Sequence, residues 1–338
     1  MPMACSQPEE RIANAATDPD IITSLPGEIK ERILTKLSIK EAVQTSILST
    51  KWRYTWASIP ELLVKDDDLV SNLSTIDGAW ASSRFTKIVD LLLFIHNGPI
   101  LKFNLSTKHH CPEAFDRWIL KLSRNGITTL IFELNMPSVT KYQIPSNFFV
   151  CNALQHVDLS MCAIKVPHGF QGFKLLRSLK LDECAITAAD IENLITSSPH
   201  LAELKLLDVK VEHNFRINAM RLKCLIISGE ILDFQMNTPQ LTAAYIELSN
   251  TMPSPARVGC HDLYRSFDGL PKIQIIGLLR FSIQGTPVMP SFVFLSPLQK
   301  KGLVIYILTG QSKIHTSCVG VSLLGYTGKE FWGRSDEL

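Results

Sequence analysis

The amino-acid sequence predicts an α/β fold in which a short N-terminal helical module precedes a curved solenoid of repeats with a parallel sheet on its concave face. Three observations support this prediction. Apolar residues recur with helical spacing over the first 60 residues, a leucine pattern recurs seven times over residues 127–276, and a helix-capping sequence stands inside one of those repeats.

Composition and charge limit the possible functions. Lysine and arginine number 34 and aspartate and glutamate number 32 among the 338 residues, which gives a formal net charge of +2. This balance provides no overall field that would attract nucleic acid or an anionic membrane. The longest strongly apolar runs, 91–95 and 303–308, are far shorter than the roughly 20 residues of a membrane-spanning helix. The N-terminus lacks the apolar core of a signal peptide, so we expect a soluble protein of the nucleus or cytoplasm with no membrane or nucleic-acid partner.

Three short helices are expected after a polar segment, 1–19, that we predict to be disordered. A capping box of Ser38 and Glu41 is predicted to open the second helix. Ser49 is predicted to cap the third helix, and Pro60 to end it. The apolar residues of the three helices are, in order, Ile29, Ile33 and Leu37; Val43 and Ile47; and Trp52 and Trp56. From this pattern alone, the module is equally well explained as the N-terminal cap of the following domain.

Two sequence elements carry a family resemblance, namely Leu25-Pro26-x-Glu-Ile and Ser49-x-Lys-Trp52-Arg. Around them, residues 20–64 resemble a plant-type F-box. This resemblance implies binding to the Skp-type adaptor of a cullin-based ubiquitin ligase. The residues that it implies for contact with the adaptor are Leu25, Pro26, Ile29, Ile33, Val43 and Trp52.

A helical bridge is predicted between the module and the repeats. The run Asp66–Asp68 is interpreted as a solvated loop. The next helix should end at Asn97–Gly98, and its apolar face is traced by Phe85, Ile88, Val89, Leu92 and Ile95. A strand around Phe103 and a second helix from Pro112 to Gly126 follow. Strand, helix and strand in this order indicate a degenerate first repeat.

The pattern Leu-x-x-Leu-x-Leu, with conservative replacements, identifies leucine-rich repeats. Successive copies begin 27, 22, 25, 21, 19 and 29 residues apart, which fits the period of this repeat. The copies are Ile127/Leu130/Phe132, Leu154/Val157/Leu159, Leu176/Leu179/Leu181, Leu201/Leu204/Leu206, Leu222/Leu225/Ile227, Leu241/Ala244/Ile246 and Leu270/Ile273/Ile275. Cys162 and Cys184 occupy the Asn/Cys position of the template, with Ile164 and Ile186 two residues later. Each unit should add one strand and complete its core only by stacking.

The order of module, bridge and repeats resembles plant F-box/LRR proteins of the F-box/FBD/LRR type over most of residues 20–285. This resemblance implies a non-catalytic substrate receptor of an SCF-type ubiquitin ligase that binds an unknown protein target. The alternative is a repeat scaffold or small-ligand sensor without ligase recruitment. After about residue 285 the chain departs from the family pattern, without a recognisable FBD domain. The expected divisions are a disordered segment (1–19), an F-box (20–64), a bridge with a degenerate repeat (65–126), leucine-rich repeats (127–285) and an atypical tail (286–338).

No catalytic, metal-binding or cofactor-binding residues are predicted. The run His109-His110-Cys111 has no second pair of ligands at metal-binding spacing. Cys162 and Cys184 are explained by the repeat template as buried residues. All eight cysteines are expected to be free thiols, since none forms a C-x-x-C pair in a chain without a secretory signal.

The target is predicted to bind the residues that flank the last two aliphatics of each repeat, because side chains alternate between the faces of a strand. These residues are mixed in charge in the earlier repeats and apolar in the later ones, where Ile276 is also expected on this face. The residues predicted to bind the target are Lys180, Lys205, Leu207, Ile226 and Tyr245. The alternative is that the tail folds back and covers this surface.

Overall fold

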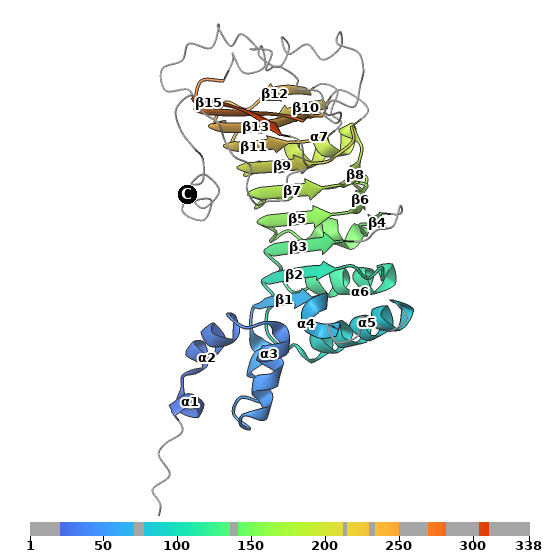
Figure 1. Cartoon of the computed structure of the whole chain (residues 1–338), viewed down its shortest axis with the longest axis vertical. Coiled ribbons are helices and arrows are strands. Elements are labelled where there is room, and N and C mark those ends of the chain that lie inside the picture. Colours follow the sequence, from blue (N-terminus) through green and yellow to red (C-terminus); the bar gives the residue numbers. More distant parts are fainter. Residues whose placement is uncertain are drawn as a thin grey trace, which may run out of the picture.

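The computed structural model describes residues 21–70, 78–135, 141–211, 215–229, 234–249, 270–281 and 304–310. These residues form a mixed α/β fold with a ten-stranded parallel sheet, and short N-terminal helices lie beside one end of that sheet (Figure 1). The predicted disordered segment 1–19 and most of the tail at 286–338 lie outside the described residues.

The N-terminal helical region begins with α1 (Ile21–Ser24), α2 (Gly27–Leu34) and α3 (Ile39–Gln44), which the 3-10 helix η1 (Thr45–Ile47) extends. The predicted capping box at the start of α3 is confirmed. The Glu41 N–H donates to Ser38 Oγ at 3.3 Å, and the Ser38 N–H donates to Glu41 Oε2 at 2.9 Å. The bond from the Ser38 backbone is the main reason that the pKa of Glu41 is lowered.

The predicted third helix is wrong in its extent. Backbone N–H groups here donate to the third residue before them, as Trp52 does to Ser49 at 3.1 Å and Thr55 to Trp52 at 3.2 Å. Only the short 3-10 helix η2 (Thr55–Ser58) is regular. Threonine and aromatic residues dominate the segment 50–56, and their side chains lose rotamer freedom in an α-helix. The segment therefore forms a series of tight turns.

The bridge contains more structure than the sequence predicted. It comprises β1 (Glu61–Lys65), α4 (Asp66–Val70), α5 (Gly78–Ile95), β2 (Lys102–Thr107) and α6 (Pro112–Ser123). The predicted solvated loop at Asp66–Asp68 is wrong, because these residues form the first turn of α4. Asp66 is also buried and accepts a hydrogen bond from the Lys108 N–H at 2.7 Å. This bond joins the end of β1 to the end of β2.

The main sheet has the strand order β1-β2-β3-β5-β7-β9-β11-β13-β14-β15, with all neighbours parallel. The strands after β2 are β3 (Thr129–Leu134), β5 (His156–Ser160), β7 (Ser178–Asp182), β9 (Glu203–Leu207), β11 (Cys224–Ile227), β13 (Ala243–Ser249), β14 (Ile275–Phe281) and β15 (Val304–Gly310). Each repeat thus adds one strand next to the strand of the preceding repeat.

Smaller elements lie beyond the C-terminal ends of the main strands (Figure 1). One short parallel sheet contains β4 (Tyr142–Gln143), β6 (Cys162–Ile164) and β8 (Ala185–Ile186), and another contains β10 (Phe215–Asn218) and β12 (Phe234–Asn237). The helical elements are η4 (Ser146–Val150) and α7 (Ala188–Thr196), and Thr187 Oγ1 caps α7 by accepting from the Asp190 N–H at 3.1 Å.

The repeat aliphatics face a continuous core. In the first six units the second and third aliphatics of each triplet are at most 3% exposed. Helix α6 packs against the same face of the sheet, where the Phe115 ring lies edge-on to Phe132 with centroids 6.1 Å apart. Burial of each such side chain contributes about 1.5–3 kcal/mol. The core therefore lies between the sheet and the connections that return to it.

The backbone adopts a left-handed conformation at equivalent positions just after four successive strands of the main sheet, β5, β7, β9 and β11. Met161, Glu183 and Asp208 have φ of 57°, 47° and 48°, and Gly229 has φ of 111°. The bend turns the next residue inward, so that Cys162 and Cys184 are buried as the template predicts. At Gly229 the bend also needs glycine, because a Cβ would lie 2.8 Å from the Val209 carbonyl oxygen.

The last predicted repeat is in the wrong register. Ile275 pairs with Ala243 and Ile276 with Ala244, so the buried Ile273 takes the place of Leu241 in the preceding unit. The prediction that Ile276 lies among the target-binding positions is therefore wrong. Leu270 and Ile273 are both buried and stand three residues apart. They therefore also fit the first two apolar positions of Leu-x-x-Leu-x-Leu, which is why the sequence favoured the wrong register. The tail, expected to be free of repeats, supplies strand β15 beside β14.

Candidate functional site

The N-terminal helical region presents large apolar side chains to solvent. They come from α1, α2, η1 and the turns between η1 and η2, and they are Ile21, Ile22, Ile29, Ile33, Ile47, Leu48 and Tyr54. Ile47 is 85% exposed and Leu48 is 70% exposed. We call this set the apolar helical surface. Several exposed large apolar side chains on one small helical module are typical of a region that binds another protein.

The residues predicted to contact the adaptor divide into two groups. Pro26, Ile29 and Ile33 are exposed, whereas Leu25 and Val43 are partly buried and pack against the core. Trp52 is only 2% exposed, and the Lys30 ammonium lies over its ring at 5.5 Å from the centroid. Trp52 therefore stabilises the module from inside and offers no surface in this structure.

The sequence prediction missed Ile21, Ile22, Ile47, Leu48 and Tyr54. A signal for Ile47 and Leu48 was present in the sequence. Adjacent residues on a helix are about 100° apart, so both side chains of an Ile-Leu pair cannot face one narrow core stripe. The loss of the predicted third helix leaves this pair without a covering element among the described residues.

The second candidate surface is the face of the main sheet opposite the core, which we call the exposed face. The strand register aligns its side chains in rows across the sheet. One row contains Asp158, Lys180, Lys205, Ile226 and Tyr245, in the strand order β5, β7, β9, β11 and β13. Leu207 lies in the next row, opposite Asp182. The five residues predicted to bind the target are thus close together on one surface.

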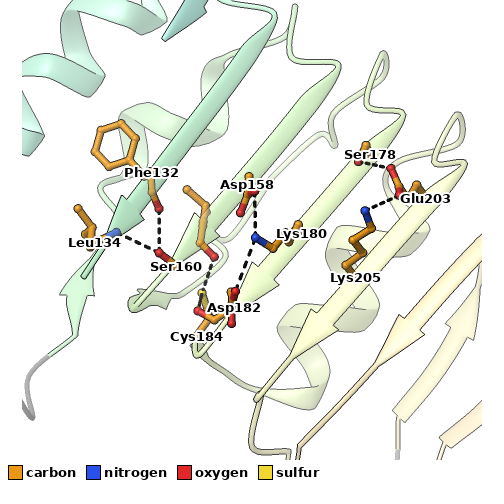
Figure 2. A network of polar contacts seen from close by, with 11 residues as sticks. Phe132, Leu134, Asp158, Ser160, Ser178, Lys180, Asp182, Cys184, Glu203 and Lys205 are labelled. Carbon is orange, nitrogen blue, oxygen red and sulfur yellow. Dashed lines mark hydrogen bonds and ion pairs between the residues drawn. The ribbon is translucent and has the colours of Figure 1, made fainter. Parts of the chain in front are cut away.

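Lys180 is held between two carboxylates. Its Nζ lies 3.2 Å from Asp158 Oδ2 and 3.6 Å from Asp182 Oδ2 (Figure 2). Burial alone would lower the pKa of Lys180, but Asp158, Asp182 and Glu133 together hold it above its ordinary value. Burial raises the pKa of Asp158 and of Asp182, and Lys180 only partly offsets this effect. Lys180 therefore remains charged and engaged within the chain.

Lys205 is also engaged within the chain. Its Nζ lies 2.7 Å from Glu203 Oε1, and Ser178 Oγ donates to Glu203 Oε2 at 2.9 Å (Figure 2). Burial would raise the pKa of Glu203, but the bonds from Lys205 and Ser178 hold it below its ordinary value. The two lysines predicted to meet the target are therefore already paired.

Cys162 and Cys184, which follow strands of the main sheet, have no features of a nucleophile. The Cys184 thiol donates to the Leu159 carbonyl oxygen at 3.2 Å, and burial raises its pKa to about 11. Burial also raises the pKa of Cys162. Both thiols stay protonated at neutral pH, which is unsuitable for nucleophilic attack.

The run His109-His110-Cys111 belongs to the packing of the bridge. His109 is buried, and its Nδ1 lies 3.0 Å from Ser82 Oγ. The Cys111 thiol lies 3.9 Å from the Ser82 carbonyl oxygen. Within the described ranges, no three His, Cys, Asp or Glu side chains are grouped as metal ligands would be. In the same ranges, none of the helices has the length and hydropathy needed to cross a bilayer.

Family models match both parts of the chain. The F-box domain model matches residues 22–63, and the model described as FBD-associated F-box protein At5g56370, LRR repeats, matches residues 115–289. The second match alone covers more than half of the chain. The chain belongs to the plant F-box/LRR proteins.

Relatives of this F-box/LRR protein occur in Arabidopsis thaliana. F-box/FBD/LRR-repeat protein At1g13570 is 34% identical over 271 residues, which cover 78% of this chain and 63% of that protein. FBD-associated F-box protein At5g56370 is 28% identical over 238 residues, covering 68% of this chain and 54% of that protein. This F-box/LRR chain therefore spans little more than half the length of these relatives.

Proposed function

We propose that this chain is the substrate-recognition subunit of a cullin-based SCF-type ubiquitin ligase. In this proposal the F-box binds a Skp-type adaptor, the leucine-rich repeats form a curved solenoid that binds the protein target, and the chain itself catalyses no reaction. The chemistry of ubiquitin transfer then belongs to other subunits, and this chain contributes proximity between target and enzyme. We place this activity in the nucleus or cytoplasm, which a fluorescent fusion would test.

The observation that carries the proposal is the direct connection between the helical region, which has the apolar helical surface, and the main sheet, which has the exposed face. The Asn97 N–H donates to the Ala57 carbonyl oxygen at 2.9 Å, and the Leu101 N–H donates to that of Pro60 at 2.8 Å. Strand β1 follows Pro60 immediately, so the helical region continues into the sheet without a linker. A receptor that must present a target at a fixed distance from its adaptor needs such a joint.

The adaptor contact can be tested by charging the apolar helical surface. Ile29→Glu with Ile33→Glu should reduce capture of a purified Skp-type adaptor by more than tenfold, because central apolar interface residues contribute 2 kcal/mol or more each. Both side chains are about 40% exposed, so the module should still fold. The measurement is adaptor binding to the immobilised full chain.

Met220→Glu is the matched control, since Met220 is 59% exposed and lies outside the helical region. Its adaptor binding should equal that of the unmodified chain. Unreduced binding by the folded double variant would exclude this surface as the adaptor site. If the unmodified chain binds no adaptor, the alternative of a repeat scaffold or ligand sensor replaces the ligase proposal.

A further inference from the structure

The exposed face of the sheet is divided into two zones of different chemistry. The acidic zone comprises Glu133, Asp158 and Asp182 on β3, β5 and β7. The apolar zone comprises Leu207, Cys224, Ile226, Ala243 and Tyr245 on β9, β11 and β13. All these side chains are partly exposed, and the register places the two zones side by side.

The acidic zone and its neighbours carry more negative than positive charge. On strands β3 to β9 of this face, the three carboxylates of the zone and that of Glu203 are accompanied by two ammonium groups, those of Lys180 and Lys205. With histidine neutral, two negative charges remain unbalanced. Both ammonium groups are already within 2.7–3.6 Å of carboxylate oxygens. The unbalanced negative charge of these partly exposed carboxylates favours an occupant that carries positive charge.

The apolar zone provides the complementary half of a docking surface. Ile226 pairs with Lys205 on one side and with Tyr245 on the other. The aliphatic and aromatic side chains therefore lie beside the paired lysine, on the next two strands of the sheet. Adjacent, partly exposed apolar side chains with a polar border are typical of the centre of a protein interface. An occupant that satisfies both zones must carry an apolar anchor and a positive charge.

The spacing of the zones limits the length of the occupant. Asp182 and Asp158 stand three and four strands from Tyr245, which at about 4.8 Å per strand is roughly 15–19 Å. An extended peptide covers about 3.3 Å per residue. About five residues of extended chain therefore separate a residue on Tyr245 from one at the carboxylates.

We propose that the exposed face binds a basic segment of the target, in which an apolar or aromatic residue precedes or follows lysine or arginine by about five positions. This inference deepens the proposed receptor function and rests on it. Acidic targets are disfavoured, because the only two lysines on β5 to β13 of this face are already paired. The positive charge supplies orientation and selectivity, and the apolar residue supplies most of the affinity.

A random dodecapeptide library displayed on phage, selected against the immobilised full chain, tests the proposal. Enriched peptides should be net basic and carry an apolar residue about five positions from a lysine or arginine. Synthetic versions of these peptides should bind at least tenfold more weakly to Glu133→Gln with Asp182→Asn, and to Ile226→Ala with Tyr245→Ala. Enrichment of acidic or neutral peptides, or of none, would overturn the proposal.

The matched control is Glu61→Gln. It removes one carboxylate from the same sheet on β1, where Glu61 is paired with Lys102 at 3.3 Å, and peptide binding should be unchanged. Loss of binding in this control would mean that net charge acts without a site. The proposal would also fail if Tyr245→Asp converted a dimer to a monomer, because a second copy would then be the occupant. Adaptor binding should be unaffected by every variant here, so failure of this inference is distinguishable from failure of the ligase proposal.

Discussion

At the scale of single residues, Gly98 shows what local sequence cannot reveal. The pattern Asn97–Gly98 predicts the end of a helix, and α5 does end at Ile95. The structure adds a second requirement, because a Cβ on Gly98 would lie 2.7 Å from the Ser58 carbonyl oxygen and 2.9 Å from Ser58 Cα. Both contacts are with backbone atoms, which cannot rotate away.

We predict that Gly98→Ala lowers the free energy of unfolding by about 1–3 kcal/mol, the usual cost of overpacking. Gly27→Ala is the control, because nothing lies within 4 Å of its Cβ position at the start of α2. Alanine there should be neutral or stabilising by up to about 1 kcal/mol. Urea denaturation of both variants measures the difference. Equal stability of the two would show that the close approach at Gly98 is absent.

The candidate site was also predictable only in part at this scale. Alternation along strands correctly placed Lys180, Ile226 and Tyr245 on one surface. It could not show that Lys180 is already paired, because its partners come from two different strands, 22 residues before and two residues after it. The prediction that Trp52 contacts the adaptor failed for a related reason. Its burial depends on a turn that the helical pattern did not predict.

At the scale of elements, α5 shows how far periodicity can be trusted. The apolar period predicted a buried face, and Phe85, Val89 and Leu92 are indeed at most 8% exposed. Ile95, assigned to the same face, is 43% exposed, and Phe94 is 83% exposed. The period identifies a face over whole turns but not where packing stops at the end of a helix.

We predict opposite outcomes for two phenylalanines of α5. Phe85 is fully buried, with its ring centroid 5.2 Å from that of His109 and 6.2 Å from that of Trp118. Phe85→Ala should lower the free energy of unfolding by about 3–5 kcal/mol. Phe94→Ala, the control on the same helix, should change it by no more than about 0.5 kcal/mol. Thermal melts of the two variants provide the comparison, and a similar loss in both would contradict the burial described for α5.

Other elements were missed for physical reasons. Strand β1 has no repeat before it, so no period identified it. The register of β14 was ambiguous because apolar residues stand at both candidate positions. By contrast, the repeats from β3 to β13 were predictable, since each buried aliphatic satisfies the local strand pattern and the spacing between units at once.

At the scale of the whole molecule, the joint between the F-box and the repeats contains a buried histidine. His96 is 4% exposed, and its Nε2 lies 2.8 Å from the Ile59 carbonyl oxygen. Burial lowers the pKa of His96, although the hydrogen bond to Ile59 opposes this shift. The neutral imidazole is therefore part of the contact that holds the two surfaces together.

We predict that the chain loses stability as the pH falls below about 6.5, the ordinary pKa of histidine. The unfolded chain binds a proton at His96 in this range before the folded chain does, so the contribution is complete above that pH and lost as the pH falls toward the lowered value. In His96→Gln this part of the pH dependence should disappear. His168→Gln, at an exposed position, should keep it. Unfolding free energies at pH 5 and pH 7 decide the matter, and equal slopes in both variants would exclude His96 as the cause.

The one-strand-per-repeat register also determines how recognition by this chain can diversify. Asp158, Lys180, Lys205, Ile226 and Tyr245 are neighbours in space, yet each lies in a different repeat and successive residues are 19 to 25 positions apart in the sequence. A substitution at one of them alters the surface on one strand only and leaves the buried leucines of that repeat unchanged. Duplication of a repeat would lengthen the surface by one strand, about 4.8 Å, without moving the F-box. Under the proposed receptor function, such a chain can acquire a new target by separate small steps while its contact with the adaptor stays constant.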